Sequence, residues 1–217
     1  MVTIDEISLA ADPGRWREAG FRVQDDSVEL GSVVLRLDGT GAGKGILGWS
    51  LRGAGGGELD GLGGERSQAP ERERGGEHPN GIAGLDHVVA MTPALDRTIA
   101  ALSGAGFELR RVREEPTPAG APRQAFFRLA DVILEVVQEP RDAILQGGGP
   151  ERPARLWGIA MVTLDIEATA RSLGELCGEV RAAVQPGRRI ATLRREAGLG
   201  VPVAVMSPVP ATAAAGA

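Results

Sequence analysis

His87 and Glu135 are the two side chains of this sequence best suited to chemistry at a buried site. His87 lies in the apolar run 85–91, on the same strand face as Val89 and Met91, because alternate residues of a strand share a face. Glu135 lies in the apolar run 133–137, where a carboxylate is costly unless it is paired, protonated or bound to a metal. An imidazole and a carboxylate suit a divalent ion such as iron, manganese, zinc or nickel, although two ligands rarely hold one. A buried hydrogen-bonded pair without a metal is the alternative.

A second group of side chains lies on or beside predicted strands and could contact a ligand. Arginine suits a carboxylate or phosphate, and a glutamine could add a neutral polar contact. Solvated outer faces explain the arginines as well, and turn geometry before Pro186 and Gly187 explains the glutamine. The ligand-binding candidates are Arg111, Arg123, Gln185 and Arg189.

The composition indicates a globular protein and argues against several partners. The 217 residues are 42% hydrophobic and 24% charged, with a net charge of −5. This charge repels phosphate backbones and anionic surfaces, so we expect neither nucleic acid nor a membrane as a partner. Residues 1–6 are acidic and lack a signal-peptide apolar region, and no apolar run approaches the ~18 residues of a membrane span. We therefore expect a cytoplasmic protein, with the single Cys177 as a buried structural thiol.

Glycine-rich breaks divide the chain into blocks of similar length. Residues 53–81 are rich in glycine and charge and have almost no apolar side chains, which predicts a linker. A second break covers 141–154, and residues 209–217 are predicted to form a disordered tail. The expected domains are an N-terminal module over 1–52 and a larger domain over 82–208.

The three blocks repeat one order of elements, strand-helix-strand-strand-strand (βαβββ). In the middle block the strands are predicted at 85–91, 107–113, 123–129 and 132–138, and the helix at 94–103. In the C-terminal block the strands are predicted at 157–162, 180–184, 189–193 and 201–206, and the helix at 165–176. In the N-terminal block the strands are predicted at 3–9, 21–24, 33–37 and 46–51, and the helix at 13–19. The predicted fold class is therefore α+β.

The chain resembles the vicinal oxygen chelate superfamily in this order of elements. It also resembles that superfamily in the opening Leu85-Asp86-His87-Val88-Val89 and the closing Ile133-Leu134-Glu135-Val136-Val137 of the middle block. That group includes glyoxalase I, bleomycin-resistance proteins and extradiol dioxygenases. The resemblance covers 82–208 as two paired modules and, more weakly, 1–52 as a third. It implies that two modules curve into a U-shaped glyoxalase-like sheet, with a ligand or metal inside the cup. His87 and Glu135 match the family's two metal-ligand positions, and Glu135 would be the catalytic carboxylate.

The C-terminal block does not supply matching ligands. Alignment on its helix places Gly158 or Ile159 at the histidine position, and alignment on its last strand places Val203 at the glutamate position. A third ligand would have to come from Glu6, Gln185, a partner subunit or the substrate. We therefore expect one divalent metal at most, bound weakly.

The resemblance leaves three functions open. The main interpretation is a glyoxalase-like protein that binds a small molecule in a cup without a tightly bound metal. The alternative is a divalent-metal-dependent lyase or dioxygenase-like enzyme that uses His87 and Glu135. An assembly module without a ligand would need a cup filled by large side chains, yet aromatic residues make up only 3% of the chain. A homodimer is expected, because the N-terminal module with Trp49 has no internal partner.

Overall fold

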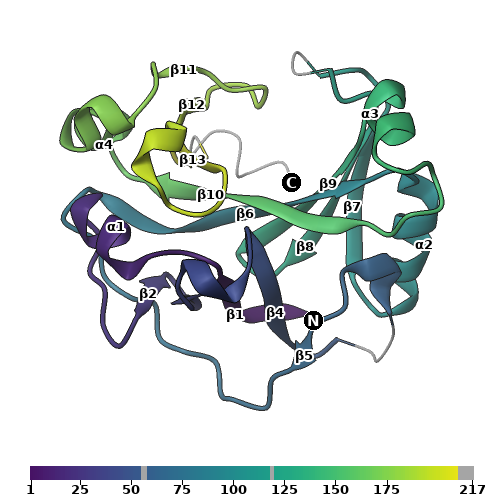
Figure 1. The fold of residues 1–217 in the computed structure, drawn as a ribbon, viewed down its shortest axis with the longest axis horizontal. Helices are drawn as coiled ribbons and strands as arrows, with labels where there is room; N and C mark the ends of the chain where they lie inside the picture. Colours follow the sequence, from purple (N-terminus) through teal and green to yellow (C-terminus); the bar gives the residue numbers. More distant parts are fainter. Residues whose placement is uncertain (55–57, 118–119, 210–217) are drawn as a thin grey trace. The chain divides into compact units, whose positions relative to one another are not determined.

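The computed structural model describes residues 1–54, 58–117 and 120–209 (Figure 1). These residues form two compact units. Unit 1 comprises Met1–Glu6, Gly48–Pro70 and His87–Gly158. Unit 2 comprises Ile7–Leu47, Glu71–Asp86 and the described residues from Ile159 onward. The strands belong to two mixed sheets, so the predicted α+β class is confirmed.

The described residues form the following strands and helices. The strands are β1 (Thr3–Leu9), β2 (Ser27–Leu30), β3 (Val33–Leu37), β4 (Ile46–Arg52), β5 (Glu65–Arg66), β6 (Ile82–Thr92), β7 (Glu108–Arg113), β8 (Gln124–Leu129), β9 (Val132–Gln138), β10 (Arg155–Thr163), β11 (Arg181–Ala182), β12 (Arg189–Thr192) and β13 (Val203–Met206). The α-helices are α1 (Pro13–Glu18), α2 (Leu95–Gly104), α3 (Arg141–Gln146) and α4 (Ile166–Leu173). The short 3-10 helices are η1 (Thr40–Ala42), η2 (Leu59–Gly61), η3 (Gly174–Leu176) and η4 (Arg195–Ala197).

Unit 1 contains the middle βαβββ module. Residues 87–92 of β6 pair in parallel with β9, and β9, β8 and β7 then pair antiparallel, so the strand order is β6-β9-β8-β7. The first and last strands of the module, β6 and β9, run parallel and lie side by side. Parallel strands need a crossover connection, and helix α2, between β6 and β7, provides it. The module therefore has the topology that the resemblance implies.

Helix α2 covers one face of this four-strand sheet. It packs on β7, β8 and β9 (Figure 1). Its Leu95 and Leu102 side chains are buried. Below it lie the fully buried Phe127 of β8 and Phe107, whose rings meet edge to face with centroids 6.4 Å apart. Alternation along the strands brings these apolar side chains to one face and leaves the other face for the residues between them.

Part of the glycine-rich segment 53–81 is held in unit 1 by specific contacts. Leu59 and Leu62 are buried, and the Trp49 indole donates a hydrogen bond to the Leu62 carbonyl at 2.9 Å. The Asp60 carboxylate accepts from Arg97 Nε at 2.8 Å and from Thr98 Oγ1 at 2.5 Å. The segment therefore contacts the first turns of α2, although the domain boundaries stay a prediction.

Unit 2 contains the C-terminal module, which repeats the same topology. β10 pairs in parallel with β13, followed by β12 and β11 in antiparallel, so the order is β10-β13-β12-β11. Asp165 caps α4 by accepting from the backbone N–H groups of Glu167 and Ala168, each at 3.0 Å. The predicted strand 180–184 is reduced to two residues, and Val184 beyond it is 56% exposed.

A pair of threonines marks the same point in both modules. In unit 1, Thr92 at the end of β6 and Thr98 in α2 have their hydroxyl oxygens 2.7 Å apart. In unit 2, Thr163 at the end of β10 and Thr169 in α4 have theirs 2.6 Å apart. Thr92 and Thr163 thus occupy equivalent positions in the two modules, and each ends a strand without capping the helix that follows.

The N-terminal block has the predicted βαβββ element order but a different strand order, β2-β3-β1-β4. The strand predicted at 21–24 is wrong, since the second strand is β2. Phe21 instead turns into the core of unit 2, where its ring lies 4.8 Å from that of Trp16 and 5.2 Å from that of His78. A turn with Asp25 and Asp26 at positive φ then starts β2.

Two other predictions concern the breaks. The break at 141–154 contains the helix α3, which was not predicted. The predicted tail at 209–217 lies outside the described residues except for the exposed Val209.

His78 is a buried residue of unit 2 whose ring makes two hydrogen bonds to the backbone. Its Nδ1 accepts from the Arg22 N–H at 3.1 Å, and its Nε2 donates to the Glu29 carbonyl at 2.9 Å. Burial lowers the pKa of His78 below its usual 6.5, so the ring is neutral at neutral pH. A protonated ring would lose the bond from Arg22, because both nitrogens would then be donors.

We expect the free energy of unfolding to decrease as the pH falls below about 6.5, because the unfolded chain then binds a proton that folded His78 does not. The loss has a slope of at most about 1.4 kcal/mol per pH unit and ends below the folded pKa. Urea unfolding at several pH values measures it. The difference between the native protein and His78→Gln isolates this residue, and a difference that does not change with pH contradicts the expectation.

Candidate functional site

The face of the unit 1 sheet opposite α2 contains both residues singled out for chemistry. Residues paired across neighbouring strands point to the same face, so the strand register defines this surface. We call this surface the site face. It has three rows of residues, each listed in the order β7, β8, β9, β6. The first row is Glu108, Arg128, Ile133 and His87; the second is Arg111, Phe126, Glu135 and Val89; the third is Arg113, Gln124, Val137 and Met91.

His87 and Glu135 meet on the site face. His87 Nε2 lies 3.4 Å from Glu135 Oε2, with the two side chains 12% and 17% exposed. The Gln124 amide of β8 donates a hydrogen bond to Glu135 Oε1. One carboxylate therefore has an imidazole beside one oxygen and an amide donor on the other.

The site face is half-buried, whereas the α2 face is closed. Val88, Leu134, Val136 and Ala125, which alternate with the site residues, are all fully buried. Val89, Met91, Ile133 and Phe126 on the site face are only partly covered. A polar group of His87, Glu135 and Gln124 surrounded by partly exposed apolar side chains can hold a proton or bind a polar group of a ligand.

The donor atoms on this face fall short of a tight metal site. A metal enzyme commonly uses three protein ligands and leaves a position open for substrate. Within the described part of the chain, no group of three or more His, Cys, Asp and Glu side chains is placed to hold an ion. The Gln124 amide nitrogen already points to Glu135, so this group supplies two ligands rather than three.

Arg111 is the predicted ligand-binding arginine that the structure brings to the site face. Its guanidinium carbon lies 4.9 Å from the centroid of the Phe126 ring, which places a cation over the aromatic face. Phe126 is the direct cross-strand neighbour of both Arg111 and Glu135. Arg111 and Glu135 are therefore separated by one aromatic side chain.

Arg123 does not lie on the site face. It precedes β8 and its guanidinium bonds both oxygens of Glu114, at 2.6 and 2.9 Å, and both oxygens of Asp96 in α2, at 3.1 and 3.0 Å. The Arg123 hydrogen bond lowers the pKa of the Glu114 carboxyl, and the two acids raise the pKa of Arg123. Arg123 links β8 to the start of α2.

Gln185 and Arg189 lie in unit 2, each with a partner there. Gln185 Oε1 accepts from Arg188 at 3.2 Å, and the Arg189 guanidinium pairs with Glu167 of α4. Arg188 itself is 6% exposed and bonds both oxygens of Asp86, at 2.5 and 3.2 Å. Sequence reasoning missed this buried pair, because its members are 102 positions apart.

The C-terminal module has no ionisable side chains at the positions equivalent to His87 and Glu135. The Thr92 and Thr163 correspondence places Gly158 at the histidine position, as one of the two sequence alignments had it. Val89 pairs with Glu135 in unit 1 and Ala160 pairs with Ala204 in unit 2, so Ala204 is the glutamate equivalent. The assignment of Val203 was one residue off, because alignment on apolar residues alone does not fix strand register.

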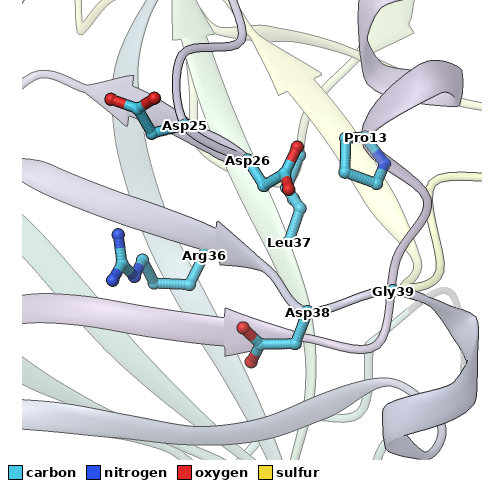
Figure 2. A pocket seen from close by; sticks show the side chains of 7 residues that line it. All are labelled: Pro13, Asp25, Asp26, Arg36, Leu37, Asp38 and Gly39. Carbon is cyan, nitrogen blue, oxygen red and sulfur yellow. The ribbon is translucent and has the colours of Figure 1, made fainter.

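Two hollows in unit 2 are separate from these residues. One, of about 340 Å³, is lined by three exposed aspartates with Arg36 and Leu37 between them (Figure 2). Asp26 of this group pairs with Arg17 at 3.6 Å. The other, of about 500 Å³, follows residues 192–203. The side chains of the first hollow are charged and solvated, so we assign no chemistry to it.

Comparison with known proteins found similarity to solved structures. No protein-family model matches the sequence, and no curated protein matches it. Methylmalonyl-CoA epimerase from Mycobacterium tuberculosis is 20% identical, with 62% of this chain and 93% of that chain covered and a TM-score of 0.49. A hypothetical protein from Bacillus halodurans is 18% identical, with 58% and 94% covered and a TM-score of 0.48. A Streptomyces coelicolor methylmalonyl-CoA epimerase variant in complex with 2-nitronate-propionyl-CoA is 21% identical, with 59% and 96% covered and a TM-score of 0.48.

The identities to this chain are 18–21%, and the TM-scores are below 0.5. Among the described residues, the helices are all too short or too polar to span a bilayer.

Proposed function

We propose that this chain is a glyoxalase-like protein that binds a small molecule on the site face of unit 1, without a tightly held metal. His87, Glu135 and Gln124 would provide the polar contacts, and the partly exposed apolar side chains around them would contact the body of the ligand. The observation that carries the proposal is the meeting of His87, Glu135 and Gln124 on one half-buried sheet face.

The polar group of His87, Glu135 and Gln124 is not explained by its contribution to the stability of the fold. Replacement of a buried ion pair by apolar side chains of similar volume is often neutral or stabilising. The surrounding positions Val89, Ile133 and Val137 are apolar and would pack equally well against a leucine at position 135. Polar groups placed together beside partly exposed apolar side chains are a common feature of binding sites.

The group is also arranged for proton exchange with a ligand. The Gln124 amide fixes one Glu135 oxygen, and the other oxygen faces the His87 imidazole at 3.4 Å. A ligand with a hydroxyl or an acidic C–H could pass a proton to this carboxylate. Glu135 is the residue we assign to that role.

A divalent-metal-dependent lyase or dioxygenase-like activity is the second candidate. It is favoured by the distance between His87 and Glu135, which would allow both side chains to ligate one ion. It needs a third ligand that this group does not include, so we derive no step that uses a metal. The homodimer and the cytoplasmic location stay predictions.

The two histidines of the chain allow a direct test. His87 lies on the site face, and His78 is a buried internal control in unit 2. We expect members of a small-molecule panel to shift the isotope-labelled imidazole resonances of His87 and leave those of His78 unchanged. The panel contains para-hydroxybenzoate, para-hydroxybenzamide, hexanoate and methylmalonyl-CoA.

Variants of the polar group complete the test. Glu135→Gln keeps the size of the side chain and removes the charge, so it should weaken binding of any panel member that shifts His87. Asp142→Asn, an exposed site in α3, is the matched control and should bind as the native protein does. If no member of the panel moves the His87 resonances, the proposal is wrong.

A further inference from the structure

We infer that the ligand of the site face is a small organic carboxylate, and that Arg111 binds its carboxylate group. This inference rests on the proposed function of the site face and adds the class of ligand. It is drawn from a bulge in β7, from the ion pairs of the neighbouring arginines and from the position of Phe126.

The bulge in β7 brings Arg111 to the site face. Leu109 pairs with Phe127, and Arg111 pairs with Phe126, so the register shifts between them. In a regular strand Arg111 would share a face with Leu109, which is the face that α2 covers. The extra residue, Arg110, reverses the alternation, and bulges of this kind are frequent where a side chain is redirected beside a functional site.

Three other arginines near this sheet have acidic partners, and Arg128, in the row of His87, donates to the Ala130 carbonyl at 3.3 Å. Arg110 pairs with Glu108 at 2.9 Å, and Arg113 lies 3.8 Å from Glu115. Arg123 is held by Glu114 and Asp96. Arg111 makes no ion pair with an acidic side chain in the described part of the chain, and its guanidinium lies over the ring of Phe126. In the row that contains Glu135, Arg111 is therefore the guanidinium whose charge is available to a ligand.

Stacking on Phe126 holds Arg111 ready for a planar anion. A guanidinium over an aromatic ring keeps its N–H groups at its edges, where they can bind a carboxylate through two parallel hydrogen bonds. One such fork matches a single carboxylate. The ring of Phe126 and the side chains of Val89 and Ile133 offer an apolar surface beside it, suited to a flat ligand body.

The opposite end of the ligand would meet the polar group. Arg111, Phe126 and Glu135 lie on three successive strands, β7, β8 and β9. Strands are about 4.8 Å apart, so the carboxylate and the group that contacts Glu135 are separated by roughly 5–10 Å. An aryl carboxylate with a hydroxyl at its far end has this arrangement, and the hydroxyl can donate to the Glu135 carboxylate, whose oxygens each accept more than one hydrogen bond.

A matched pair of probes tests the inference in the full-length protein. Para-hydroxybenzoate and para-hydroxybenzamide have the same shape and hydroxyl, and only the first has a carboxylate. Dissociation constants come from titrations that follow the His87 imidazole resonances. We expect the acid to bind about tenfold more tightly than the amide, as a charge-assisted hydrogen-bond pair would give.

The variants separate Arg111 from its neighbours. Arg111→Gln should reduce the preference for the acid to about onefold, and Arg111→Lys should keep part of it because the charge remains without the planar fork. Arg110→Gln, which changes the net charge equally at a residue paired with Glu108, should keep the full preference. A stacking role in stability alone would not change the ratio of the two constants.

Three results would overturn the inference. They are a native protein that binds acid and amide equally, an Arg111→Gln variant that still prefers the acid, and loss of the preference in Arg110→Gln. If neither probe moves His87 while other panel members do, the inference fails and the proposed function stands. If no panel member moves His87, the proposed function itself fails.

Discussion

Replacement of Arg188 with methionine is expected to lower the free energy of unfolding by about 3–5 kcal/mol. The Arg188 side chain is 6% exposed and donates to both Asp86 oxygens, to Gln185 and to the Ser207 carbonyl. Its removal leaves Asp86, 16% exposed, as a buried charge without this cation. Urea unfolding followed by tryptophan fluorescence measures the loss.

The adjacent arginine provides the matched control. Arg189 and its partner Glu167 are each 47% exposed, so Arg189→Met should cost less than about 1 kcal/mol. The double variant Asp86→Asn with Arg188→Met should recover part of the loss, because no buried charge then lacks a partner. Equal losses for Arg188→Met and Arg189→Met would contradict the role of the buried pair.

Replacement of Asp60 with alanine is expected to cost about 3 kcal/mol, the second largest effect. The 9% exposed carboxylate accepts from Arg97 and Thr98, and Thr98 in turn lies 2.7 Å from Thr92 at the end of β6. Asp60 also has a φ of +53°, which alanine adopts less readily than aspartate or asparagine. The alanine variant therefore loses hydrogen bonds and gains backbone strain.

Asparagine at the same position separates the two contributions. Asp60→Asn keeps the tolerance for positive φ and an oxygen that can accept from Thr98, and it removes the charge that faces Arg97. It should lose about half as much stability in the same urea experiment. The exposed Asp142→Ala should change stability by less than about 0.5 kcal/mol. An Asp60→Ala variant as stable as Asp142→Ala would show that the segment around η2 is not fixed by this carboxylate.

Much of the fold was predictable because the buried strands are short runs rich in apolar residues. β1, β3 and β9 lie at the residues predicted for them, and each has apolar side chains at the spacing that a half-buried strand requires. The repeated order of elements supplied the topology, since a strand, a helix and three further strands within a short block leave few ways to pack. The parallel pairing of β6 with β9 and of β10 with β13 follows from that repeat.

The failures have local causes that apolar patterning does not reveal. Phe21 looked like the start of a strand, but its ring is needed in the cluster with Trp16 and His78. Residues 180–184 have the composition of a strand, yet only two of them pair with β12. Their strand, β11, is the edge strand of its module. In both places long-range packing outweighed local preference.

The candidate site was predictable by residue type and not by geometry. His87 and Glu135 stood out because ionisable residues are rare in apolar strands. Gln124 gave no such signal, since its contact with Glu135 depends on the register of β8 against β9. Arg111 and Arg123 looked equivalent in the sequence, and the β7 bulge places the first on the site face while the second pairs with Asp96 of α2.

The most direct test of the central proposal is a titration of chelator-treated, metal-free protein with the small-molecule panel, followed through the His87 imidazole resonances. We expect the ligand-dependent shift of His87 to persist without metal and to need higher ligand concentrations in Glu135→Gln, because the contacts come from His87, Glu135 and Gln124 themselves. A shift that appears only after zinc, manganese, nickel or ferrous iron is added at one ion per chain would contradict it, and would favour the metal-dependent enzyme.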